Sequence, residues 1–253
     1  MSGHSKWKTI KRKKGVADAA RGQVFTKLAR DIAVAARAGG ADVEMNFRLR
    51  LAVQKAKENN MPVGNVERAI QRGAGTGEGG QVTLEEVVYE GFAPGGAAIM
   101  LEAVTDNATR TVAEVRSIFT KAGGNLGERG SVAWNFDQRG VIVVEASGAQ
   151  ADELALMAID AGAEDFDQDG DNLEIRTSPN AFESARQALE AAGATILRAE
   201  LALVPKTTLT LDVKASLQTL RLLDRLEALD DVQRVYTNAD FPQDALEEYQ
   251  KAS

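Results

Sequence analysis

The chain has 253 residues, of which 44% are hydrophobic and 26% charged, a globular composition long enough for two or three domains. It contains no cysteine and one histidine, His4, which excludes disulfides and thiolate or multi-histidine zinc sites and strongly disfavours a Ser-His-Asp triad. No apolar run is long enough to cross a bilayer, so we expect a soluble, cytoplasmic protein.

The formal net charge of −7 hides an uneven distribution of charged residues along the chain. Residues 1–75 hold 16 basic and 6 acidic side chains, whereas residues 76–253 hold 14 basic and 31 acidic ones. A polyanion would be attracted to the first part and repelled by the second. This charge separation predicts that the N-terminal part binds nucleic acid.

The N-terminal part is predicted to form three helices, because its apolar residues recur at intervals of three or four. The first covers residues 16–38, the second starts at an N-cap at Asp42, and the third starts at Pro62 and ends at Gly73. The first fifteen residues have no apolar face and are expected to form a mobile arm. The expected core residues are Phe25, Leu28, Ile32, Ala36, Phe47, Leu51, Val53, Val63, Val66 and Ile70.

The segment GAGTGEGG at residues 73–80 contains five glycines. It lacks the Lys-Ser/Thr end of a phosphate-binding loop, and no strand precedes it, so a flexible linker is the favoured interpretation. A new domain is therefore expected to begin shortly after residue 80.

The rest of the chain alternates strands and helices and contains an internal repeat. Strands at 141–146 and 173–177 are each followed by a helix, a turn with glycine between two alanines, and another strand. Two such units in series predict the βαββαβ ferredoxin-like arrangement. The flanking segments supply further strands, including one at 207–213, and helices near 108–121 and around Leu217–Leu229.

We therefore predict an α+β protein with an N-terminal three-helix domain and two α/β (ferredoxin-like) domains, one inserted in the other. The expected boundaries are 1–75 for the basic helical domain, 81–132 plus 206–253 for one α/β domain, and 133–205 for the inserted domain. Two consecutive domains with a C-terminal appendage are the alternative.

The basic residues near the N-terminus are the first candidate site. They could be an ordinary solvated charge run, but they are dense and almost unopposed by acidic residues, and Trp7 could stack on a base. Phosphate contacts of this kind do not distinguish DNA from RNA. The candidate residues are Lys6, Trp7, Lys8, Lys11, Arg12, Lys13, Lys14, Arg21, Lys27 and Arg30.

A second candidate is TDNATRTVAEVR at residues 105–116, between a predicted strand and a predicted helix. Asp106 or Asn107 is expected to cap that helix. The helix N-terminus and Arg110 could also receive a phosphate, so Arg110 is added to the nucleic-acid-binding residues.

The acidic stretch GAEDFDQDGDNLE at residues 162–174 is the third candidate. Asp165, Asp167 and Asp169 match the first ligands of an EF-hand loop, but Arg176 stands where the bidentate glutamate should be. A solvated hairpin turning at Asp169-Gly170 is favoured, and no metal or cofactor is predicted. If these carboxylates did bind Mg²⁺, a nuclease acting on branched DNA would be the alternative function.

Seven segments of the chain resemble the YebC/PmpR family of TACO1-like regulators of gene expression: GHSKWKTIKRKK, RGQVFTKLAR, NFRLRLAVQKAKENNMP, NVERAIQRG, YEGFAPGG, VTDNATRTVAEVR and FTKAGGNLGERGSVAW. The resemblance extends over essentially the whole chain and is weaker after residue 137. It implies a helical N-terminal domain followed by two α/β domains, one inserted in the other. It also implies a role in gene regulation, either as a DNA-binding transcriptional regulator or as a ribosome-associated translation factor.

Two non-enzymatic functions are therefore favoured over the nuclease alternative. The chain has no clear helix-turn-helix pattern or dimer zipper, which argues against specific promoter recognition. A translation factor would use both parts of the charge distribution: the basic residues 1–75 would bind rRNA, and the acidic residues 76–253 would contact ribosomal proteins. We predict a cytoplasmic, nucleic-acid-binding regulator of transcription or translation without a membrane partner.

Overall fold

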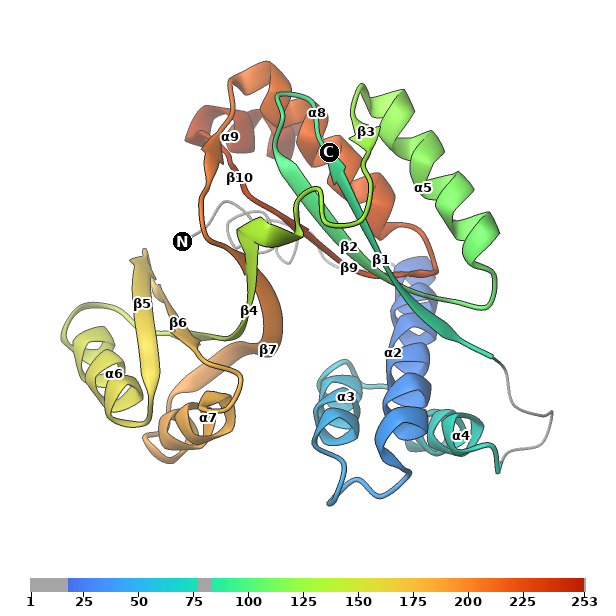
Figure 1. Ribbon diagram of the computed structural model, residues 1–253. Helices are drawn as coiled ribbons and strands as arrows, with labels where there is room; N and C mark the ends of the chain where they lie inside the picture. Colours follow the sequence, from blue (N-terminus) through green and yellow to red (C-terminus); the bar gives the residue numbers. More distant parts are fainter. Residues whose placement is uncertain (1–17, 77–82, 253) are drawn as a thin grey trace. The chain divides into compact units, whose positions relative to one another are not determined.

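The computed structural model describes residues 18–76 and 83–252 (Figure 1). The expected mobile arm and half of the glycine segment, residues 77–80, lie outside these ranges. The chain has the predicted α+β fold, with an N-terminal helical domain followed by two sheet-containing domains, one inserted in the other. No described helix is both long and apolar enough to cross a membrane.

The N-terminal domain contains the three predicted helices: α2 (Asp18–Gly39), α3 (Phe47–Glu58) and α4 (Val63–Ala74). Its core forms where the apolar faces of these helices meet, and burial of these side chains is the main stabilising contribution. The buried residues are Leu28, Ile32, Ala35, Ala36, Leu49, Val53, Ala56, Met61, Val66 and Ala69.

Two details of this domain differ from the prediction. The N-cap of α3 is Asn46, not Asp42: the Asn46 side chain accepts from Leu49 N at 3.1 Å and donates to Ala35 O at 2.8 Å. Asp42 instead caps the preceding turn through Glu44 N. Val63 and Phe47, both predicted to be buried, are 67% and 36% exposed, because each is the first residue of its helix, before the helix reaches the core.

Gly73 was predicted to begin the linker but is a buried residue of α4. A Cβ at this position would lie 2.2 Å from the carbonyl oxygen of Ala33 in α2. The absence of a side chain therefore lets the backbones of α2 and α4 approach closely. The prediction that the third helix reaches Gly73 is therefore confirmed, and the prediction that the linker includes this residue was wrong, because a glycine at a close helix crossing cannot be distinguished from a linker glycine by sequence.

The first sheet has the strand order β3-β1-β2-β9, and α5 and α8 lie side by side on one face of it (Figure 1). Strand β1 pairs antiparallel with β2 and β3. The elements of this domain are β1 (Glu85–Phe92), β2 (Ala98–Thr105), α5 (Ala108–Ala122), β3 (Asn125–Leu126), α8 (Val213–Glu227), β9 (Val232–Thr237) and α9 (Gln243–Ala252).

The second sheet has the order β5-β6-β4-β7 with antiparallel pairing throughout, which is the predicted ferredoxin-like arrangement. Helix α6 packs over β5 and β6, and α7 packs over β4 and β7. The elements are the short 3₁₀ helix η1 (Ala133–Asn135), β4 (Phe136–Glu145), α6 (Gly148–Asp160), β5 (Ala163–Asp169), β6 (Asn172–Thr177), α7 (Phe182–Ala191) and β7 (Thr195–Pro205).

The segment predicted as a strand at 207–213 pairs over only two residues. These form β8 (Leu209–Thr210), which lies parallel to β10 (Ala239–Asp240). The strand ends there because Asp212 caps α8, accepting from Ala215 N at 2.7 Å. Helix α9 was not predicted.

Contacts within the chain divide it into two compact units. One contains residues 133–210 with 236–240, and the other contains the helical domain, the first sheet up to Val132, and residues 211–235 with 241 onward. The helical domain and most of the first sheet thus belong to one unit. The three domain boundaries expected from the sequence remain a prediction.

We predict that Gly73→Ala destabilises the protein by about 1–3 kcal/mol, because the added methyl group forces α2 and α4 apart. Urea unfolding followed by far-ultraviolet circular dichroism measures this loss. Gly64→Ala is the matched control in the same helix, because a Cβ there has nothing within 4 Å. Equal stability of Gly73→Ala and the wild-type protein would contradict the close crossing.

Candidate nucleic-acid interface

The second sequence candidate folds around one buried carboxylate, that of Asp231. Thr105 ends β2, Asn107 is the N-cap of α5, and Arg110 and Thr111 lie in its first turns. Asp231 directly precedes β9 and is only 5% exposed. The expected capping role of Asn107 is confirmed, since its side chain accepts from Arg110 N at 3.0 Å.

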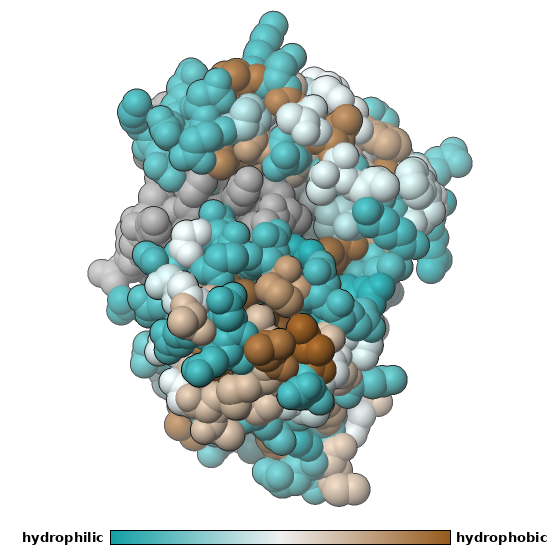
Figure 2. Space-filling model, turned by 90° about the vertical axis from the view of Figure 1, so that its left-hand side faces the viewer, coloured by the Kyte–Doolittle hydropathy of each residue, from teal (hydrophilic) through white to brown (hydrophobic). Residues whose placement is uncertain are grey.

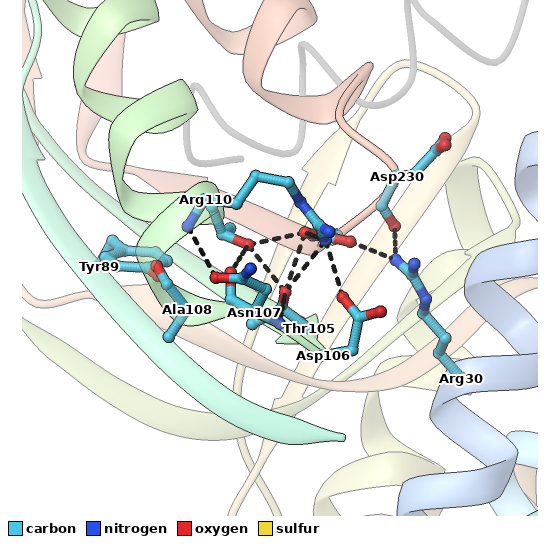
Figure 3. Close-up of polar contacts among 10 residues, drawn as sticks. Arg30, Tyr89, Thr105, Asp106, Asn107, Ala108, Arg110 and Asp230 are labelled. Atoms are coloured by element: carbon cyan, nitrogen blue, oxygen red, sulfur yellow. Dashed lines mark hydrogen bonds and ion pairs between the residues drawn. The ribbon is translucent and has the colours of Figure 1, made fainter. Parts of the chain in front are cut away.

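Four side chains donate to the Asp231 carboxylate (Figure 3). Thr105 and Thr111 donate to Oδ2 at 3.0 and 2.6 Å, and Arg110 donates to the same oxygen at 2.8 Å. Arg30 of α2 reaches Oδ1 from the helical domain, also at 2.8 Å. One carboxylate therefore joins β2, α5, α2 and the start of β9.

These contacts set the pKa of Asp231. Burial of the carboxyl group opposes ionisation and by itself would raise the pKa. Hydrogen bonds from Thr111, Arg110 and Thr105, together with the positive charge of Arg30, outweigh this effect and lower the pKa to about 2. The group is therefore ionised at neutral pH and holds both guanidinium groups by charge-assisted hydrogen bonds.

Further contacts hold α2 against the same region. Lys27 donates to the carbonyl oxygen of Glu227, and Arg30 donates to that of Asp230 at 2.6 Å. Next to these polar contacts, Ala33 and Val34 of α2 form a buried apolar cluster with Leu84 and Val104. The helical domain is thus attached to the first sheet by a polar and an apolar contact side by side.

The predicted binding residues are therefore found in different situations. Lys27, Arg30 and Arg110 are engaged with the 227–231 loop, and Arg110 also pairs with Asp106 at 2.9 Å. Arg21 lies on the exposed surface of α2. The remaining candidates, Lys6, Trp7, Lys8, Lys11, Arg12, Lys13 and Lys14, lie outside the described residues. Their role in binding stays a prediction.

A groove of about 1000 Å³ runs between α2 and α4, beside this attachment point. Its apolar lining includes Phe25 and Ala69, and its polar lining includes Arg30, Arg68 and Arg72. None of the described residues that line it is acidic. Such a surface attracts phosphate groups at its rim and offers apolar area for the face of a base.

Arg68 and Arg72 were missed by the sequence analysis. Their separation of four residues in the predicted third helix places them on one face, and this spacing was the available signal. Arg68 is held by hydrogen bonds to Gly64 O, at 3.0 Å, and to the Asn65 side chain. Its guanidinium group is therefore oriented by its own helix.

The acidic stretch forms the predicted hairpin between β5 and β6. Arg176 lies among its carboxylates, with nitrogen–oxygen distances of 2.7 Å to Asp165, 3.0 Å to Glu174 and 3.6 Å to Asp167. A guanidinium group thus occupies the position where the EF-hand pattern would need a ligand. In the part of the chain that the structure describes, no group of three or more His, Asp or Glu is arranged to hold a metal ion.

Comparison with known proteins agrees with this architecture. Residues 5–76 match the family model described as the TACO1/YebC protein N-terminal domain, and residues 84–239 match the model of the TACO1/YebC second and third domain. The fold and these matches define a three-domain protein with a helical N-terminal domain and two sheet domains. The chain belongs to the TACO1/YebC family.

Its relatives include proteins described as "Probable transcriptional regulatory protein". One from Dehalococcoides mccartyi is 53% identical over 249 residues, covering 98% of both chains. One from Pelotomaculum thermopropionicum is 54% identical over 240 residues, covering 94% of this chain and 98% of its own. The crystal structure of a conserved hypothetical protein from Aquifex aeolicus is similar, with a TM-score of 0.81, 45% identity, and coverage of 89% of this chain and 93% of that one.

We predict that Asp231→Asn lowers the free energy of unfolding at pH 7 by roughly 2 kcal/mol, because hydrogen bonds to a charged partner are lost. The pKa of about 2 lies below the ordinary 3.8, so this contribution is complete above about pH 4 and disappears as the pH falls through 2. Wild-type stability should therefore fall more steeply than that of the variant between pH 4 and 2.

Urea unfolding at several pH values measures both effects. Asp230→Asn is the control, because Asp230 is exposed and offers only its carbonyl oxygen to Arg30. If the free energy of unfolding depends on pH in the same way for wild type and Asp231→Asn, then protonation of Asp231 is not the cause of the loss of stability.

Proposed function

We propose that this protein is a non-enzymatic regulator of translation that binds ribosomal RNA through its basic helical domain. The observation that supports this most directly is the groove between α2 and α4, which presents Arg68 and Arg72 and has no acidic residue among its described lining. Arginine can contact phosphate through two nitrogens and stack on a base, so it suits an irregular RNA surface.

The charge distribution supports the same proposal. Residues 76–253 carry 31 acidic against 14 basic side chains, so their net charge opposes the binding of nucleic acid. A ribosome presents both RNA and basic proteins, and a molecule with a basic head and an acidic body is electrostatically complementary to such a mixed surface. Protein-free DNA would contact only the basic helical domain.

Binding to promoter DNA is the second candidate, favoured by the description of the relatives as transcriptional regulatory proteins. Helix α2 is the longest helix of the basic domain, but Lys27 and Arg30 on it point to the 227–231 loop. That face is therefore not available for reading a major groove. Non-specific contacts between the N-terminal arm and DNA phosphates would not need this face of α2.

Sucrose-gradient sedimentation of the tagged protein from growing cells separates the two candidates. Co-migration with ribosomal particles that is lost as salt rises supports the translation proposal, because phosphate contacts are salt-dependent. Absence from every ribosomal fraction, together with gel-shift binding to one promoter that scrambled DNA does not compete away, supports the transcription candidate instead.

We predict that Arg68→Gln with Arg72→Gln weakens binding to purified ribosomes and to protein-free rRNA on the order of tenfold, and lowers the slope of log K against log salt by about 2. Filter binding between 50 and 200 mM salt, roughly the range over which such contacts weaken most, measures both quantities. The reason is the loss of two guanidinium groups from the groove.

Arg221→Gln with Arg225→Gln is the matched control. These residues are also exposed and four apart, but they lie on α8 and do not line the groove. If the control pair weakens rRNA binding as much as the α4 pair does, the effect is one of net charge and the groove is not the binding site.

A further inference from the structure

Helix α6 of the inserted domain exposes large apolar side chains. Leu156 is 64% exposed, Ile159 44% and Met157 41%. Leu156 and Ile159 are three residues apart and therefore form one apolar stripe on the helix, with Asp152 on the same face four residues before Leu156. An apolar stripe at an exposed helix face is a common feature of interaction surfaces.

The exposed stripe is not needed for the core of its own domain. The opposite face of α6 is buried through Ala151, Leu154, Ala155 and Ala158, and it already covers β5 and β6. Leaving Leu156 and Ile159 in water gains no packing within this unit. Their apolar character is therefore unexplained by the fold itself.

The neighbouring strand β5 is an edge strand of its sheet and contributes another exposed apolar side chain. Phe166 is 44% exposed and is paired across the ladder with the fully buried Ile175, so both belong to the sheet face that the helices cover. Apolar residues are thus exposed on both α6 and the adjacent strand. Figure 2 looks onto the side where these elements lie and shows apolar surface bordered by hydrophilic surface.

The surroundings of this surface are strongly acidic. Between Arg139 and Arg176 the chain contains ten Asp or Glu residues and no Lys or Arg. Some of these carboxylates pair with the two flanking arginines. Asp152, Glu153 and Asp160 on α6 form no ion pair with other described residues.

We infer that the exposed faces of α6 and β5 form a docking surface for a basic, amphipathic segment of a ribosomal protein. Leu156 and Ile159 would contact its apolar side chains, and the unpaired carboxylates of α6 would contact its Lys or Arg residues. The inference rests on the proposed function, because it places the partner on the ribosome. It assigns a protein contact to a domain separate from the RNA-binding groove.

Charge decides between the occupants. Nucleic acid is repelled by this surface, and a second copy of the chain would bring two acidic surfaces together. The chain's own N-terminal arm is basic but has no apolar face to cover Leu156 and Ile159. A basic amphipathic segment satisfies both the charge and the apolar stripe, as in the binding of a helix to a groove.

The test compares the full-length double variant, Leu156→Ser with Ile159→Ser, with the wild-type protein. Two assays are used: co-sedimentation with purified ribosomes and filter binding to protein-free rRNA. We expect ribosome affinity to fall on the order of tenfold or more and rRNA affinity to stay unchanged, because the stripe contacts protein only. Asp152→Asn with Asp160→Asn should weaken ribosome binding at low salt and flatten its salt dependence.

Val88→Thr is the control, since it removes exposed apolar carbon from β1 in the other unit and should leave both affinities unchanged. A thermal melt followed by circular dichroism should show all variants folded, because every substituted side chain is exposed. Unchanged ribosome binding by the Leu156/Ile159 variant overturns the inference, as does an equal loss of rRNA binding.

Two further outcomes separate the inference from the proposed function. If the Arg68/Arg72 variant loses rRNA and ribosome binding while the Leu156/Ile159 variant keeps both, the proposed function stands and the docking surface is wrong. If the apolar variant loses ribosome binding and the arginine variant binds like wild type, the docking surface stands and the RNA groove is wrong. A gain in rRNA affinity on removing Leu156 and Ile159 would identify the arm as the occupant and overturn the inference.

Discussion

The carboxylate of Asp231 connects parts of the chain that are far apart in sequence. It accepts hydrogen bonds from the end of β2, the first turns of α5 and the middle of α2, so three elements are positioned relative to one buried charge. A buried charge is stable only when donors surround it. The carboxylate therefore helps to orient α2, together with the contact of Lys27 with Glu227 and the apolar cluster around Leu84.

This attachment explains why the basic domain is not uniformly available to a ligand. Lys27 and Arg30 use their donors on the 227–231 loop, whereas Arg68 and Arg72 remain on the exposed side of α4. The same residue type thus has two roles in one small domain. Cations facing the body stabilise the arrangement of the helices, and those facing the groove can meet a phosphate.

Separation of charge between domains has a physical advantage for a protein that contacts two kinds of surface. A single domain with mixed charges would attract RNA and basic protein weakly and without orientation, whereas a basic head and an acidic body orient the molecule before contact. The hairpin around Arg176 shows that the acidic body also satisfies part of its own charge. The carboxylates left unpaired on α6 are those beside the exposed apolar stripe.

The sequence alone determined the elements that depend on local patterns: the three basic helices, the βαββαβ repeat, a helix cap at Asp106 or Asn107, and the separation of charge. These follow from periodicity, capping and composition, which act over a few residues. Only the tertiary structure revealed that Gly73 lies at a helix crossing, that Arg30 and Arg110 meet at Asp231, and that Arg68 and Arg72 line a groove. Arg30 and Asp231 are 201 positions apart, and no local pattern records which distant residue a side chain will meet once the chain has folded.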